Sequence, residues 1–206
     1  MISRFSLTRL TQKIQEFSPS LGGVFTYSDL FNLIGSESKL KNNRTILRLL
    51  QEEVIFKVQR GFYITPNVDL WVLACQLKKT ACISMDSVLA RNALIGTLPT
   101  RSVSTIYPGM GRKTVETPFG NLRYFSIKKE LIFGTSRLKN GIIVADSEKA
   151  YLDLLYYYVK GARFVIDPLK DISLSKLDLK KIKKYLKAYK NPKFVKFVEG
   201  QIREIA

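Results

Sequence analysis

The chain has 206 residues and 46% of them are hydrophobic, which excludes a disordered or collagen-like polypeptide. The 34 Lys and Arg residues outnumber the 17 Asp and Glu residues, so the formal net charge is +17. A charge of this size favours a polyanionic partner, above all nucleic acid. Histidine is absent, and the two cysteines, Cys75 and Cys82, are too few for a four-cysteine zinc site. We therefore expect no metal and no cofactor.

Residues 1–66 predict a winged helix-turn-helix. Apolar residues at helical spacing predict a first helix over Phe5–Phe17. Thr26 and Asp29 form a capping-box pattern that starts a short second helix, which Gly35 ends. A third helix follows over Lys39–Glu53, and two β-rich runs around Gly61 then predict a hairpin. Three helices followed by a hairpin are typical of a winged helix, whose third helix enters the major groove of DNA.

The third predicted helix has the side chains that read DNA. Arginine can bind guanine through two hydrogen bonds and asparagine can bind adenine in the same way, while basic residues on the hairpin are placed to meet phosphates. The inward face of this helix is expected to hold Leu40, Ile46, Leu47 and Leu50, with Leu49 as a further candidate. The candidate DNA contacts are Lys41, Asn42, Asn43, Arg44, Thr45, Arg48, Lys57 and Arg60. The alternative is a winged helix that contacts another protein.

Residues 67–206 predict an α+β domain. A helix over Val68–Leu77 leads into it, and a short helix follows Ser84. Later runs are β-branched and aromatic, as in a small sheet, and Asp146-Ser147 opens another helix. Two amphipathic helices rich in lysine end the chain. An accessory basic surface that binds the DNA backbone is expected at Arg112, Lys113, Lys180, Lys181, Lys183, Lys184 and Lys187; the alternative is a solvated helix face.

Four segments resemble the AbiEi family of abortive-infection antitoxins. They are Gly23–Thr26, Arg60–Tyr63, Ile83–Leu89 and Val144–Asp153. The last segment is the most specific, because it matches the family's Ala-x-x-Glu-Lys-Ala-x-x-Asp signature. The resemblance spans most of the chain, although Val88 stands where the family usually has alanine.

The resemblance implies a transcriptional regulator of a toxin–antitoxin operon. Such a protein represses its own promoter through operator repeats in double-stranded DNA. Its C-terminal domain neutralises a nucleotidyltransferase-like toxin encoded beside it, and the resemblance leaves open whether the two proteins touch. It implies no enzymatic activity.

The main alternative is a metal-dependent nuclease. Asp146, Glu148 and Lys149 follow a predicted buried strand, and clustered carboxylates with a lysine are typical of such sites. However, Glu148 and Lys149 are adjacent, whereas the usual nuclease order places one residue between the acid and the lysine. We also expect a cytoplasmic protein without a membrane anchor, because the longest apolar run, Leu70–Leu77, is far too short to cross a bilayer.

Overall fold

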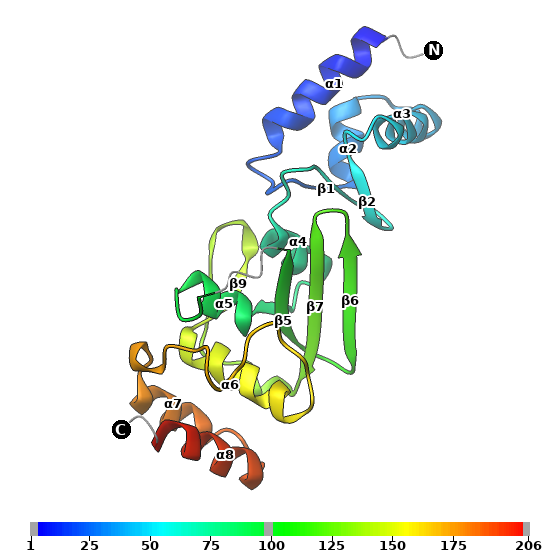
Figure 1. The fold of residues 1–206 in the computed structure, drawn as a ribbon. Coiled ribbons are helices and arrows are strands. Elements are labelled where there is room, and N and C mark those ends of the chain that lie inside the picture. Colours follow the sequence, from blue (N-terminus) through cyan, green and yellow to red (C-terminus); the bar gives the residue numbers. More distant parts are fainter. Residues whose placement is uncertain (1–3, 97–100, 204–206) are drawn as a thin grey trace. The chain divides into compact units, whose positions relative to one another are not determined.

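The structure is a computed structural model that describes residues 4–96 and 101–203, with residues 4–6 described for their backbone alone. The chain forms two compact units. Unit 1 comprises Met1–Leu73 and Val115–Phe119, and unit 2 comprises Ala74–Thr114 and Gly120–Ala206. Unit 1 therefore includes more than the 66 residues assigned to it from the sequence. Helices and sheets occur in both units, which confirms the α+β class (Figure 1).

Unit 1 has the element order of a winged helix-turn-helix. Its helices and strands are α1 (Arg4–Phe17), β1 (Val24–Thr26), α2 (Tyr27–Ile34), α3 (Lys39–Gln51), β2 (Phe56–Gln59) and β3 (Phe62–Ile64). Strand β3 lies between β1 and β2 and is antiparallel to both. The three predicted helices and the hairpin are confirmed. Strand β1 was not predicted, because three residues are too few for a periodic signal.

Local signals in the sequence fix the ends of α2 and α3. The Thr26 hydroxyl accepts a hydrogen bond from the Asp29 N–H at 3.2 Å, and the Asp29 carboxylate accepts one from the Thr26 N–H at 2.7 Å. This capping box starts α2, which ends at Gly35 in the left-handed region that favours glycine. The Ser38 side chain caps α3 by accepting from the Lys41 N–H.

One apolar core holds unit 1 together and sets the orientation of α3. It gathers buried side chains from α1, α2, α3 and the sheet, namely Leu10, Ile14, Phe25, Leu30, Ile46, Leu49, Ile55 and Tyr63. Burial of a large aliphatic or aromatic side chain contributes about 1.5–3 kcal/mol each. Because α3 contributes two of these residues, its opposite face is turned towards solvent.

Unit 2 is built on a mixed sheet with the order β6-β7-β5-β4-β9-β8, although residues 115–117 of β6 belong to unit 1. Helix α4 (Leu70–Leu77) spans the boundary between the units. The strands are β4 (Cys82–Ile83), β5 (Ser102–Pro108), β6 (Arg112–Thr117), β7 (Gly120–Ile127), β8 (Thr135–Arg137) and β9 (Ile143–Ala145). Strand β5 runs parallel to β7, and β4 runs parallel to β9. The predicted strands are confirmed, and the very short β4 and β8 were not predicted.

Helices pack around α6 in unit 2. They are α5 (Asp86–Arg91), α6 (Ser147–Val159), α7 (Leu179–Leu186) and α8 (Pro192–Arg203). Helix α6 packs against α5, α7 and α8 (Figure 1). The predicted apolar stripes of the last two helices are confirmed, since Ile182, Leu186, Phe194, Val198 and Ile202 are buried. Among the helices of the described residues, none is both long and apolar enough to span a bilayer.

Candidate nucleic-acid interface

Helix α3 presents a basic face to solvent. Its sequence contains Lys39, Lys41, Arg44 and Arg48 and no Asp or Glu. The side chains of all four basic residues are exposed, as is that of Asn43. Within the described part of the chain, Lys41 and Arg44 form no ion pair, so no carboxylate neutralises them. A cationic helix face of this kind suits the major groove, where guanine and adenine edges accept hydrogen bonds.

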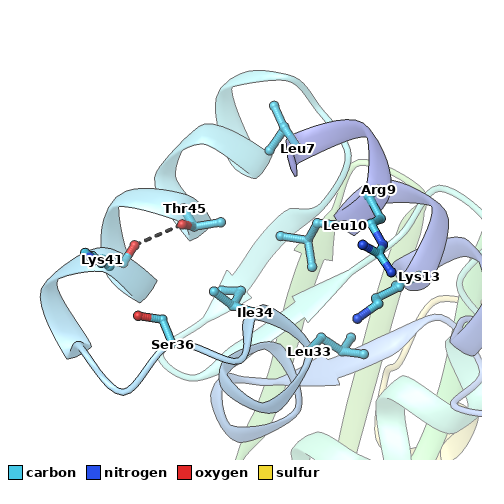
Figure 2. A pocket seen from close by; sticks show the side chains of 9 residues that line it. All are labelled: Leu7, Arg9, Leu10, Lys13, Leu33, Ile34, Ser36, Lys41 and Thr45. Atoms are coloured by element: carbon cyan, nitrogen blue, oxygen red, sulfur yellow. Dashed lines mark hydrogen bonds between the residues drawn. The ribbon is translucent and has the colours of Figure 1, made fainter. Parts of the chain in front are cut away.

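Two of the predicted contacts on α3 are buried, and their prediction was wrong. Asn42 is 0% exposed and Thr45 is 2% exposed. The Asn42 Nδ2 donates to the Ser36 carbonyl at 2.8 Å, which holds the loop before α3. The Thr45 hydroxyl donates to the Lys41 carbonyl at 2.9 Å, as Figure 2 shows. Both side chains therefore stabilise unit 1 and cannot reach a DNA base.

The orientation of α3 also exposes two leucines that were expected on its buried face. Leu40 and Leu47 are 61% and 57% exposed, and Arg44 lies on the same face between them. Asn42, Thr45, Ile46 and Leu49 follow the i, i+3, i+4, i+7 pattern of a buried stripe. The expectation was right for Ile46 and Leu49 and wrong for Leu40 and Leu47. The exposed face consequently combines cations with apolar side chains.

Tyr27 connects the β2–β3 turn to α3. Its backbone N–H donates to the Gly61 carbonyl at 2.9 Å, and its hydroxyl donates to the Asn43 Oδ1 at 2.9 Å. Lys57 on β2 and Arg60 at the turn are both exposed, as predicted. Tyr27 thus links the two elements that carry the remaining candidate contacts. The role of Tyr27 was not predicted, because a tyrosine at the first position of a helix has no distinctive sequence pattern.

A hollow of about 470 Å³ lies beside α3 in unit 1 (Figure 2). Leu7, Leu10, Leu33 and Ile34 give it an apolar lining, while Arg9, Lys13 and Lys41 add positive charge. Lys41 is therefore both a member of the basic face of α3 and a lining residue of this hollow. Thr45 lines the hollow too, which agrees with its position away from the exposed face.

Six of the seven residues predicted for the accessory basic surface of unit 2 are exposed. Arg112 and Lys113 are exposed at the start of β6, and the exposed lysines of the C-terminal part are Lys180, Lys183, Lys184 and Lys187. Lys181 is different, because its Nζ lies 2.8 Å from Glu148 and 3.1 Å from Asp146. Its charge is neutralised within unit 2, so its assignment to an open basic surface was wrong.

The residues of the nuclease alternative are all engaged within unit 2, where Lys181 pairs with both Asp146 and Glu148. Asp146 caps α6 by accepting from the Lys149 N–H at 2.9 Å, and it also accepts from the Tyr185 hydroxyl at 2.7 Å. Burial raises the pKa of Glu148, but hydrogen bonds from Lys181 and the Asp178 N–H outweigh it and the net pKa is lowered. Residues 4–96 and 101–203 contain no group of three or more Cys, Asp or Glu side chains placed to hold a metal.

Lys149 belongs to a buried polar network. It is 0% exposed and forms an ion pair with Asp153, one helical turn further along α6. The Ser84 hydroxyl donates to Asp153 at 2.6 Å, and Lys149 donates to the Tyr189 hydroxyl at 3.3 Å. The basic partner of Asp153 is therefore Lys149. This network joins the segment before α5 to α6 and to the segment between α7 and α8.

The fold is similar to that of a solved structure. That structure is the crystal structure of the RV2827C protein from Mycobacterium tuberculosis, with a TM-score of 0.59 and 10% sequence identity over 91% of this chain and 73% of that chain. At this level of identity the likeness concerns the fold. No protein-family model matches the sequence, and no curated protein matches it either.

Proposed function

We propose that the protein is a DNA-binding transcriptional regulator that recognises its operator with α3 and the β2–β3 turn. The observation that carries this proposal is the exposed face of α3, which has four basic residues and no acidic one in a unit with winged-helix order. The overall charge of +17 adds long-range attraction to a polyanion.

The two elements have different roles in this proposal. Arg44, Arg48 and Asn43 contact base edges, and the exposed methyl groups of Leu40 and Leu47 suit the methyl group of thymine. Lys57 and Arg60 at the turn bind phosphates, as does Lys41 at the start of α3. The exposed lysines of α7 and the cations of β6 supply further phosphate contacts. Base contacts give specificity, whereas phosphate contacts give affinity that falls with salt.

We further propose that the operon regulated by this protein encodes a nucleotidyltransferase-like toxin. In this proposal the protein is the antitoxin to that toxin, is cytoplasmic and has no enzymatic activity. The support is the resemblance of four segments to AbiEi antitoxins. The most specific of them, Val144–Asp153, contains the carboxylates and the lysine that stabilise unit 2. In this family-based proposal, unit 2 is responsible for neutralising the toxin.

The test of DNA binding is a titration of the full chain against the duplex upstream of its own gene. A shuffled duplex of equal length and composition is the control. We expect the protein to bind the upstream duplex more tightly than the shuffled duplex at every salt concentration. Equal affinity for both duplexes contradicts an operator-specific regulator, and co-expression with the neighbouring gene tests the antitoxin role separately.

A further inference from the structure

Four cationic side chains line a small hollow in unit 2. They are Arg112 and Lys113 from β6, Arg123 from β7 and Arg163 from the loop after α6. We call this site the basic hollow. Its volume is about 140 Å³, far below the roughly 300–1,000 Å³ of pockets that enclose drug-sized ligands. A small charged group fits it, whereas a whole ligand of that size does not.

The charge of the basic hollow is poorly neutralised. Arg123 Nη1 lies 3.7 Å from Asp86, which is buried. In the described parts of the chain, Arg112, Lys113 and Arg163 form no ion pair. Lys78 is close enough to Lys113 to feel its charge: burial lowers the pKa of Lys78, and Lys113 lowers it further. Like charges held together in this way repel one another until an anion joins them.

The two strand arginines are held in fixed positions. The guanidinium carbon of Arg123 lies 5.1 Å from the ring centroid of Phe125 and 5.2 Å from that of Phe164. An N–H of Arg123 also donates to the Arg163 carbonyl at 2.8 Å. Arg112 lies 5.3 Å from the ring centroid of Tyr157, and it donates to the Lys160 carbonyl at 3.3 Å. Contacts with aromatic faces stabilise each cation and leave its other N–H groups available.

We propose that the basic hollow binds a phosphoryl group, supplied either by a free nucleotide or by the backbone of a nucleic acid. A terminal phosphate carries up to two negative charges and three free oxygens, whereas a backbone phosphodiester carries one charge and two free oxygens. A terminal phosphate can therefore accept hydrogen bonds from more of the four cations than a phosphodiester or a carboxylate can. Guanidinium groups match phosphate geometry through paired hydrogen bonds, and the Thr114 hydroxyl at the edge of the hollow is a further donor.

This inference concerns unit 2 alone and does not depend on DNA recognition by α3. The test is calorimetric titration of the full chain with inorganic pyrophosphate. Arg112→Gln and Arg163→Gln are the test variants, because both side chains are exposed and their replacement leaves no buried charge. Arg137→Gln, an exposed arginine of β8, is the matched control. Each test variant is expected to weaken pyrophosphate binding at least about tenfold, and the control is expected to bind like the wild type.

Two further titrations identify the source of the phosphate. If nucleotides occupy the site, ATP binds with the same dependence on Arg112 and Arg163, and Arg163→Gln leaves the binding of a random duplex unchanged. If a nucleic-acid backbone occupies it, both variants weaken binding of the random duplex. Arg44→Ala is expected to leave pyrophosphate binding unchanged, which separates this site from α3. Pyrophosphate that fails to bind the wild type, or binds both test variants as tightly as the wild type, overturns the inference.

Discussion

The Tyr27 hydroxyl donates a hydrogen bond to the Asn43 Oδ1 at 2.9 Å, while the Tyr27 backbone holds the turn of the hairpin at Gly61. One residue therefore connects both elements of the proposed DNA interface. Asn43 is exposed, and the hydrogen bond from Tyr27 orients its amide group. An oriented amide is what paired recognition of adenine requires.

Tyr27→Phe is expected to reduce operator affinity about 2- to 10-fold, which corresponds to the loss of one ordinary hydrogen bond. The free energy of unfolding is expected to change little, because the bond is exposed. Operator titration and urea unfolding of the same preparation give both quantities. A variant that unfolds much more easily and keeps full affinity contradicts the positioning role of Tyr27.

Asn42→Ala is expected to lower the stability of the protein, whereas Asn43→Ala is expected to weaken operator binding. Asn42→Ala removes a buried bond to the Ser36 carbonyl and lowers the free energy of unfolding by about 1–3 kcal/mol. Asn43→Ala changes stability by less than about 0.5 kcal/mol, as is usual at the surface, and weakens operator binding. Urea unfolding and DNA titration of both variants check this contrast. Stable Asn42→Ala protein with a specific loss of operator binding would return Asn42 to the DNA interface.

These asparagines show how far the sequence alone could lead. The boundaries of α2 and α3 were predictable, because Thr26, Asp29 and Gly35 have local preferences that the core does not override. The face of α3 was not predictable from hydrophobicity. Two polar residues, Asn42 and Thr45, are buried and each donates a hydrogen bond to a backbone carbonyl, although the Asn42 Oδ1 has no partner among the described residues. Leu40 and Leu47 remain exposed. Because the prediction took the most apolar face of α3 as the buried one, it wrongly placed Leu40 and Leu47 in the core.

The ion-pair partner of a charged side chain could not be predicted from the sequence either. Lys181 looks like its neighbours Lys180, Lys183 and Lys184, and only the packing of α7 on α6 brings it to Asp146 and Glu148. The cations of the basic hollow are also dispersed, since Arg112, Arg123 and Arg163 lie on separate elements. The spacing of these residues along the chain does not indicate which of them come together in the folded protein.

Removal of Lys149 is expected to destabilise the protein strongly. Lys149→Met leaves the Asp153 carboxylate buried without its partner, at a cost of about 3–5 kcal/mol. The double variant Lys149→Met with Asp153→Leu removes both charges and is expected to be more stable than Lys149→Met alone. Urea unfolding of the single and double variants provides the comparison, with exposed Lys160→Met as control. A double variant less stable than Lys149→Met shows that the network contributes more than charge compensation.

The contribution of Lys181 is expected to depend on pH. Because the net pKa of Glu148 is lowered in the folded state, its ion pair stabilises the protein above the unfolded pKa of about 4.3 and this stabilisation disappears as the pH falls through the lower folded value. Lys181→Met is therefore expected to cost about 1 kcal/mol at neutral pH and progressively less in acid. Lys184→Met serves as the control and is expected to show no such trend. A cost that stays constant down to acid pH contradicts the ion-pair assignment.

We expect that substitutions in α3 can abolish repression of the promoter without abolishing protection from the proposed toxin. A variant with Arg44→Ala and Arg48→Ala loses base contacts of α3 and is expected to lose repression of its promoter. Its protection of cells that express the toxin from an unrelated promoter is expected to remain, because unit 2 is unchanged. A promoter fusion and a growth assay in the same strain measure the two activities. Loss of both activities indicates that protection depends on operator binding.

The most direct test of the proposed DNA recognition compares Arg44→Ala, Arg48→Ala and Arg60→Ala on operator and random duplexes at several salt concentrations. At least one of the two α3 variants is expected to lose about 1–3 kcal/mol on the operator and much less on random DNA. Arg60→Ala is expected to weaken both duplexes equally and to reduce the salt slope by about one unit. If both α3 variants weaken operator and random DNA alike, or neither changes binding while replacement of the exposed lysines of α7 abolishes it, α3 is not the element that recognises the operator.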